Sequence, residues 1–179
     1  GQKLTDKTSM NSQAGSGDLL MVVDVNDTSS SAEGTSKKMD FKYVIQTDKI
    51  SVTSAEFQAM DATGGAGTFR LLANSPGAGY GFQILSATVI GKYVSATESS
   101  NNSLYLGYVS NSTSAYWGVA GRFMSGKTSD TTFTLKDNVS TSPALLASFD
   151  DKPLVLYSNG NFNGDFTADV YITYQVIQL

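Results

Sequence analysis

The sequence predicts an all-β protein, a two-sheet antiparallel jelly roll preceded by a small N-terminal β unit. Short apolar or alternating segments recur about every ten residues and are separated by turns rich in Gly, Asn and Ser, which is typical of sandwiches and barrels. Hydrophobic residues make up 40% of the chain and charged residues only 16%, the composition of a folded domain rather than a disordered one. Helical periodicity is confined to one short stretch, Ser140–Asp150, which could hold a single helical turn.

The first part of the chain predicts two strands joined by a loop. Asp18–Val25 is an almost continuous apolar run between turn-forming residues, and in Lys37–Ile45 Met39, Phe41 and Tyr43 alternate with polar residues. A two-stranded unit is not stable alone, so it must pack on the rest of the chain or on another protein. We therefore expect residues 1–48 to form a docking arm and residues 49–179 to form the jelly-roll knob.

The knob region predicts eight strands. They are Lys49–Thr53, Thr68–Ala73, Tyr80–Lys92, Leu104–Ser110, Tyr116–Phe123, Thr131–Leu135, Leu154–Tyr157 and Asp169–Ile177. Turn-forming residues separate them, such as Ser75-Pro76-Gly77 and Asn159-Gly160. Eight short strands in one domain fit a jelly roll or a related sandwich.

The last strand is unusual because neither of its faces is strongly polar. One face is predicted to be buried and carries Val170, Ile172, Tyr174 and Val176. The other face should meet water, yet it has no charge after Asp169; it carries Tyr171, Thr173, Gln175, Ile177 and Leu179. Such a mixture of aromatic, aliphatic and uncharged polar groups is typical of protein interfaces. The sequence therefore predicts an oligomer, with a covering loop of the same subunit as the alternative.

Residues for enzymatic chemistry are scarce. The chain has no His and no Cys, which excludes a Ser–His–Asp triad, a thiol nucleophile and a conventional zinc site. Acid–base chemistry would fall to carboxylate pairs such as Asp150 with Asp151 or Asp165 with Asp169. These pairs lie in turns or at a strand start, where solvated side chains are the commoner interpretation. We expect no enzymatic activity and no cofactor.

Two stretches resemble calcium-binding loops in their spacing. The first, Asp24–Thr35, has Ser where an EF-hand loop needs Gly and Thr where it needs a bidentate Glu. The second, Asn159–Asp165, offers only amide oxygens until its last residue. The favoured interpretation of the second stretch is a pair of tight turns in which Asn and Gly adopt positive φ. The sequence therefore predicts no metal site.

Charge and hydropathy also limit the expected partners. The net charge of −4 provides no basic surface for nucleic acid or for an anionic membrane. No apolar run approaches the ~18 residues that a membrane-spanning helix needs. The absence of Cys leaves the compartment undetermined and slightly favours assembly in a cytosol.

Three stretches resemble parts of bacteriophage structural proteins. "NSPGAGYGFQILSATV", residues 74–89, resembles the Pro-Gly-x-Gly turn and first long strand of their jelly-roll domains. "LVLYSNGNFNGDFTADVYITYQVI", residues 154–177, resembles the paired final strands of these domains. "GDLLMVVDVNDTSSSAEGTSKKMDF", residues 17–41, looks like a small module that opens many phage fibre and decoration proteins. Together they cover about a third of the chain, and residues 95–152 match no motif.

The resemblance implies a trimeric protein of the phage particle. Such jelly rolls are similar to tumour-necrosis-factor-like domains, which form trimers with the last strand near the three-fold axis. It implies a homotrimer whose interface uses Tyr171, Thr173, Gln175, Ile177 and Leu179. The expected function is capsid decoration or cementing, in a virion assembled in the host cytoplasm. The major capsid protein or a tail protein would be the partner, bound through Leu19, Leu20, Met21, Val22 and Val23.

Two other functions remain open. A tail-fibre or tail-tip adhesin would bind a host surface glycan through Tyr105, Tyr108 and Tyr116, whereas Trp117 is expected in the core. The start Gly1-Gln2-Lys3 reads like a natural one, and 179 residues leave no room for a fibre shaft, which favours decoration. The other alternative is a secreted tumour-necrosis-factor-like ligand or carbohydrate-binding module, expected to carry glycosylation or a signal peptide.

Overall fold

The computed structural model describes residues 19–30, 32, 34–40, 44–60, 69–108, 116–137 and 150–179. The chain divides between Val44 and Ile45 into two units. The division falls before the expected boundary at residues 48 and 49, because the first strand of the larger unit already begins at Gln46.

The smaller unit contains an antiparallel hairpin. Its strands are β1 (Leu19–Asp24) and β2 (Thr35–Asp40), and they pair from Leu19 opposite Asp40 to Asp24 opposite Thr35. The first strand was predicted closely. The second begins two residues earlier than expected and ends at Asp40, and Phe41 and Tyr43 of the predicted alternation lie outside the described residues.

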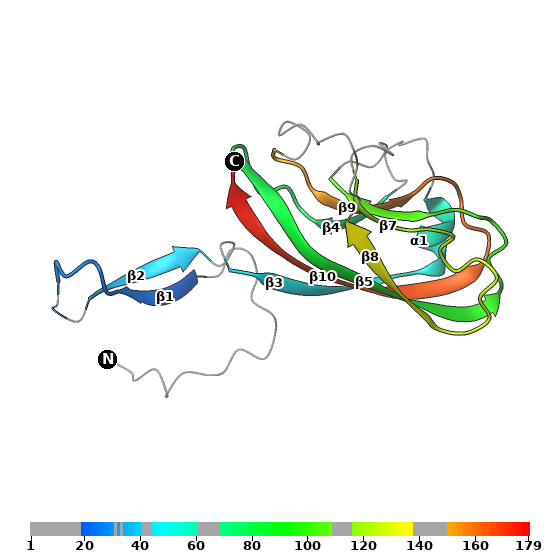
Figure 1. The fold of residues 1–179 in the computed structure, drawn as a ribbon, viewed down its shortest axis with the longest axis horizontal. Coiled ribbons are helices and arrows are strands. Elements are labelled where there is room, and N and C mark those ends of the chain that lie inside the picture. The colour runs from blue at the N-terminus through cyan, green and yellow to red at the C-terminus, as the bar shows by residue number, and fades with distance from the viewer. Residues whose placement is uncertain are drawn as a thin grey trace. The chain divides into compact units, whose positions relative to one another are not determined.

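The larger unit is an antiparallel β-sandwich (Figure 1). One sheet has the strand order β3-β10-β5-β8, and the other has the order β7-β6-β9-β4. Strand β8 belongs to both, because Thr131–Leu135 pair with β5 while Lys136 and Asp137 pair with β7. The strands are β3 (Gln46–Val52), β4 (Arg70–Ala73), β5 (Tyr80–Ala96), β6 (Leu104–Gly107), β7 (Tyr116–Ala120), β8 (Thr131–Asp137), β9 (Leu154–Ser158) and β10 (Asp165–Gln178).

The pairing of these eight strands is nested, as in a jelly roll. The first strand pairs with the last, β3 with β10, and the second with the second-last, β4 with β9. The third and sixth strands, β5 and β8, pair next, followed by the central hairpin of β6 and β7. Rolling up such a long hairpin gives two sheets that face each other, which confirms the predicted fold class.

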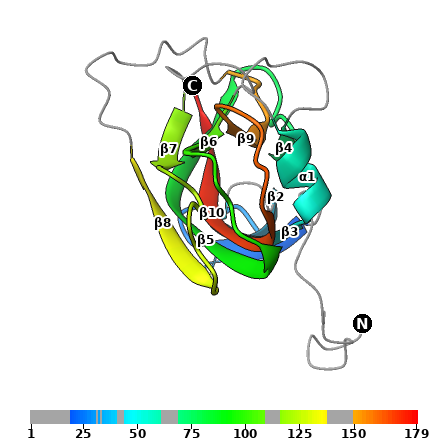
Figure 2. The ribbon, with the colours of Figure 1, turned by 90° about the vertical axis from the view of Figure 1, so that its right-hand side faces the viewer.

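A short helix closes one side of the sandwich. Helix α1 (Ser54–Ala59) lies in the chain between the edge strands β3 and β4, and Figure 2 shows it on the β4 side, opposite β8. A capping box formed by Thr53 and Glu56 begins the helix. Its Phe57 is fully buried, with ring centroids 5.5 Å from Phe123 and 4.8 Å from Phe166. The helix therefore supplies an aromatic side chain to the core.

Several predicted boundaries are corrected by the structure. Strand β10 begins at Asp165 rather than Asp169, because Asp165–Ala168 also pair with the far end of β5. Strand β7 ends at Ala120 and is followed by a turn that buries Phe123. Helix α1 was not predicted, and the helical turn expected at 140–150 lies almost entirely outside the described residues.

Candidate functional site: the outer face of the β10 sheet

The last strand alternates strictly between the core and the surface. Val170, Ile172, Tyr174 and Val176 are buried, as predicted. On the opposite side Tyr171 and Leu179 are exposed, and Thr173, Gln175 and Ile177 are half-buried. These five residues are the predicted trimer interface, and the structure places the first four in one row on the solvent side of the sheet.

Neighbouring strands extend this row into a broad surface, which we call the outer face. It consists of the side chains of the β3-β10-β5-β8 sheet that point away from the core. Its described members include Thr47, Lys49, Ser51, Gln83, Leu85, Ser86, Thr88, Ile90, Lys92, Thr132, Thr134, Asp165, Thr167, Asp169, Tyr171, Thr173, Gln175 and Ile177.

Most charges of the outer face are gathered around one carboxylate. Asp169 accepts hydrogen bonds from Lys92 Nζ at 2.7 Å and from Ser51 Oγ at 2.8 Å, and Lys49 Nζ lies 3.1 Å from it. These three donors, Lys92 first, hold the pKa of Asp169 far below its usual range. The same carboxylate raises the pKa of Lys49. Each of the three charged groups thereby has a partner of opposite sign within the sheet, and the two lysines and one carboxylate leave the cluster with a net positive charge.

The uncharged polar groups of the outer face are paired in the same way. Thr47 and Thr173 share a hydrogen bond of 3.0 Å between strands β3 and β10, and Gln175 Nε2 donates to Gln83 Oε1 at 2.5 Å between β10 and β5. Burying a polar group is costly mainly when it loses its partner, and these groups would keep theirs. The outer face can therefore be covered at low cost.

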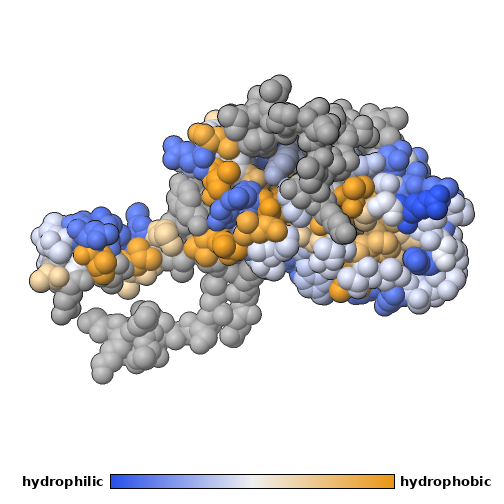
Figure 3. Space-filling view, viewed as in Figure 1, coloured by the Kyte–Doolittle hydropathy of each residue, from blue (hydrophilic) through white to orange (hydrophobic). Residues whose placement is uncertain are grey.

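A β-bulge places a large apolar side chain on this surface. Thr173 pairs with Ser86 and the next residue, Tyr174, pairs with Ile84, so Leu85 is the extra residue of β5. Leu85 is 43% exposed. Figure 3 shows hydrophobic residues gathered over the ends of β5 and β10 near the C-terminus, with hydrophilic residues between them.

The inner face of the same sheet includes a polar cluster around Tyr174. Tyr174 donates a hydrogen bond of 2.7 Å from its hydroxyl to Asp48, and Gln46 Oε1 lies 3.3 Å from the same hydroxyl. Burial, followed by the neighbouring Asp48, raises the pKa of Tyr174. The cluster ties the buried side of β10 to the edge strand β3.

The predicted docking residues lie on the first hairpin strand. Met21 is 75% exposed and Val22 is half-buried, while the side chains of Leu19, Leu20 and Val23 lie outside the described residues. The hairpin thus presents an exposed apolar side chain, and its role in docking stays a prediction.

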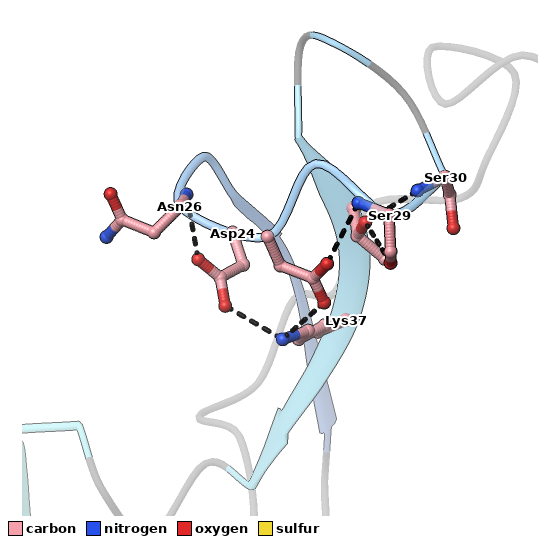
Figure 4. A network of polar contacts seen from close by, with 7 residues as sticks. Asp24, Asn26, Ser29, Ser30 and Lys37 are labelled. Carbon is pink, nitrogen blue, oxygen red and sulfur yellow. Dashed lines mark hydrogen bonds and ion pairs between the residues drawn. The ribbon is translucent and has the colours of Figure 1, made fainter.

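The turn of this hairpin is the first of the two calcium-like stretches, and a lysine takes the place that a cation would have (Figure 4). Lys37 Nζ lies 2.8 Å from Asp24 Oδ2 and 2.9 Å from Asp27 Oδ2. Hydrogen bonds from Ser29 and then Lys37 lower the pKa of Asp27 to about 2. The two carboxylates therefore anchor the second strand to the turn.

The second calcium-like stretch is held by a buried carboxylate. Glu98 is 1% exposed, and its oxygens accept the backbone N–H groups of Ser100 at 2.6 Å and of Asn163 and Gly164 at 2.8 Å. The side-chain oxygens of Asn159 and Asn163 accept the backbone N–H groups of Ser103 and Ser99. These amides serve as hydrogen-bond partners of the 98–103 segment.

The prediction that Asn and Gly adopt positive φ angles within Asn159–Asp165 is wrong. None of residues 159–164 has one, whereas Gly77 and Gly79 in the earlier turn do, at 101° and 81°. Gly164 is needed for a different reason: a Cβ there would lie 2.7 Å from the backbone nitrogen of Glu98. The glycine allows the two backbones to approach each other.

The carboxylates considered for acid–base chemistry all have structural partners. Asp151 and Asp150 accept the backbone N–H groups of Gly77 at 3.0 Å and Gly79 at 2.8 Å and so hold that turn. Asp165 accepts the Ser95 hydroxyl at 2.5 Å. Within the part of the chain that the structure describes, no cluster of three or more acidic side chains is arranged to hold a metal ion.

Two of the three predicted receptor residues have described side chains, and both make contacts within the jelly roll. Tyr105 is half-buried and its ring stacks on Tyr157 at 5.3 Å between centroids. The Tyr108 hydroxyl donates to the backbone oxygen of Phe82 at 2.9 Å, and the Tyr116 side chain lies outside the described residues. Trp117 packs against the core, as expected. Contact of these tyrosines with a receptor stays a prediction.

The comparisons with known proteins leave the family open. Searches of protein-family models, of curated proteins and of solved structures gave no match. Among the described residues no helix has both the length and the apolar character to cross a membrane. The outer face is consequently the feature from which a function can be argued.

Two features of the site were not predicted from the sequence, namely the outward position of Leu85 and the ion pairs of Asp169. Only the first of them has a signal in the sequence. Along β5 the buried positions change from even numbers at Phe82 and Ile84 to odd numbers at Ala87 and Val89. Such a change of phase indicates an extra residue in the strand, and it could have revealed Leu85. The pairing of Asp169 with Lys49 and Lys92 had no local signal, because the three residues lie on three different strands.

Proposed function

We propose that this chain is a non-enzymatic structural protein of a phage particle, in which the jelly roll forms a homotrimeric knob that decorates or cements the capsid. The observation that carries the proposal is the outer face. Three of its described charged groups, Asp169, Lys49 and Lys92, are paired with one another, the fourth, Asp165 at the start of β10, accepts the Ser95 hydroxyl, and the other side chains named above are uncharged.

The size of the outer face supports self-association. Strand spacing and rise per residue give it a flat area of about 600 Å². Stable interfaces bury about 800 Å² on each partner, so the outer face is of the right order for a subunit contact. In a trimer this face points toward the axis, and the rest of the jelly roll points outward.

The hairpin supports attachment to a larger particle. It has only two strands, and the exposed Met21 and Val25 on its first strand and turn are available for contact with another protein. In the proposed function these apolar groups bind the major capsid protein or, in a fibre, a tail protein. The resemblance of residues 17–41 to the small module that opens many phage fibre and decoration proteins favours the same assignment.

The association is tested by placing a charge on the outer face. Ile177→Asp buries a carboxylate at each subunit contact and is expected to convert a trimer into a monomer, because an unpaired charge in an interface costs several kcal/mol. Leu71→Asp is the matched control: Leu71 is 40% exposed but lies on β4 in the other sheet. Light scattering at micromolar concentration measures the mass of both variants and of the wild type.

A wild-type protein that is monomeric at these concentrations would overturn the trimer. The particle assignment is tested separately by the genes that flank this one. Capsid and portal genes beside it would support decoration, and tail genes would support a fibre. A neighbourhood without virion genes would overturn both.

A further inference from the structure

We propose that Leu85, turned outward by the bulge in β5, is the anchor residue through which the outer face binds a second copy of this chain. The inference rests on the proposed self-association and names the residue that dominates it. Leu85 was not among the interface residues expected from the last strand.

The bulge gives Leu85 its position. Without an extra residue, the side chains of β5 would alternate regularly between the core and the surface along the whole strand. No two successive side chains would then point outward. Instead Ile84 and Ala87 are buried while Leu85 and Ser86, between them, are exposed. Bulges commonly re-aim a side chain, and this one lifts the largest exposed aliphatic group of the outer face into solvent.

The neighbours of Leu85 favour burial of the whole patch. Opposite the bulge lies Thr173, which is already bonded to Thr47, and next to it lies the bonded pair Gln83 and Gln175. An apolar side chain surrounded by polar groups with satisfied hydrogen bonds resembles the apolar centre and polar rim of protein interfaces. A partner that covers Leu85 breaks none of these bonds.

Charge favours a second copy over a partner of opposite charge. Asp165 lies eight residues along β10 from Thr173, and the nearer charges of the outer face are grouped at Asp169, four residues from Thr173. This spacing corresponds to about 13 Å, which exceeds the screening length of about 8 Å at physiological ionic strength. Two copies can therefore bring their Leu85 regions together with little repulsion, and the patch offers a charged partner nothing to pair with.

The test compares two exposed strand leucines. Leu85→Ser is expected to weaken the trimer by about tenfold or more in dissociation constant, as for other interface anchors. Leu71→Ser removes the same side chain from a 40% exposed site on β4 and is expected to leave the trimer unchanged. Leu85→Met, which keeps the apolar volume, should retain association. Sedimentation velocity over a dilution series gives the dissociation constants, and circular dichroism confirms folding.

The outcomes separate this inference from the proposed function. A monomeric wild type overturns the self-association itself. If the wild type is trimeric and the Leu85→Ser variant forms trimers with the same dissociation constant, only the role of Leu85 is overturned. If Leu85→Ser does not fold, Leu85→Gln, which keeps the length of the side chain, takes its place with the same expected loss.

Discussion

At the scale of single residues, Asp169 is the polar centre of the outer face. Its side chain is 8% exposed, although those of its partners Lys49 and Lys92 are about half exposed, at 53% and 43%. A carboxylate in this position must keep its cations, because a nearly buried charge without partners is strongly unfavourable. The three residues come from β3, β5 and β10, so the cluster also ties neighbouring strands together.

The Asp169 cluster should make stability depend on pH. Because the pKa of Asp169 is lowered in the folded state, its contribution to the free energy of unfolding is complete above the unfolded pKa of about 3.9 and declines as the pH falls below it. Asp169→Asn should lower the free energy of unfolding by about 1–2 kcal/mol at pH 7. Urea denaturation at pH 7 and pH 3 should show the difference from wild type shrinking at pH 3; an equal difference at both values would contradict the assignment.

At the scale of elements, the turn before β10 depends on a close approach of two backbones. Gly164 is buried, and a Cβ at this position would lie 2.7 Å and 2.8 Å from the backbone N and Cα of Glu98. Backbone atoms cannot move aside as the end of a long side chain can. The hydrogen bonds of Glu98 to this turn would be disturbed at the same time.

Gly164→Ala should therefore lower the free energy of unfolding by about 2–3 kcal/mol, the cost of an overpacked site. Gly121→Ala is the control, since a Cβ there meets no atom within 4 Å and no positive φ is involved. Urea denaturation of both variants gives the comparison. Equal stability of the two variants would show that the turn can relax around the added methyl group.

At the scale of the whole molecule, the jelly roll has a core of its own. The described core runs from Val52 to Val176 and lies entirely within the larger unit. The nested pairing of β3 with β10 closes the sandwich without any strand from the hairpin. The two units should therefore be separable.

Deletion of residues 1–44 should leave a folded jelly roll with a cooperative thermal transition and the oligomeric state of the full chain, because all eight strands of the sandwich remain. In the proposed function the truncated protein no longer binds particles. Circular dichroism, light scattering and co-sedimentation with particles measure the three properties. Loss of folding would show that the hairpin completes the core, and binding at full occupancy would place the anchor in the jelly roll.

The sequence by itself determined where most strands of the sandwich lie and which side of the last strand is buried. The alternation from Val170 to Val176 and the turn residues between strands act over a few residues, so they can be read in a short window. The capping box of Thr53 and Glu56 is equally local and could have revealed α1. It was overlooked because six residues are too few to show helical periodicity.

Only the tertiary structure decided which residues share a surface. Thr47 bonds to Thr173 and Lys92 to Asp169 because β10 lies between β3 and β5, a consequence of nested pairing across most of the chain. These relations join residues far apart in sequence, and no local pattern of side chains specifies them.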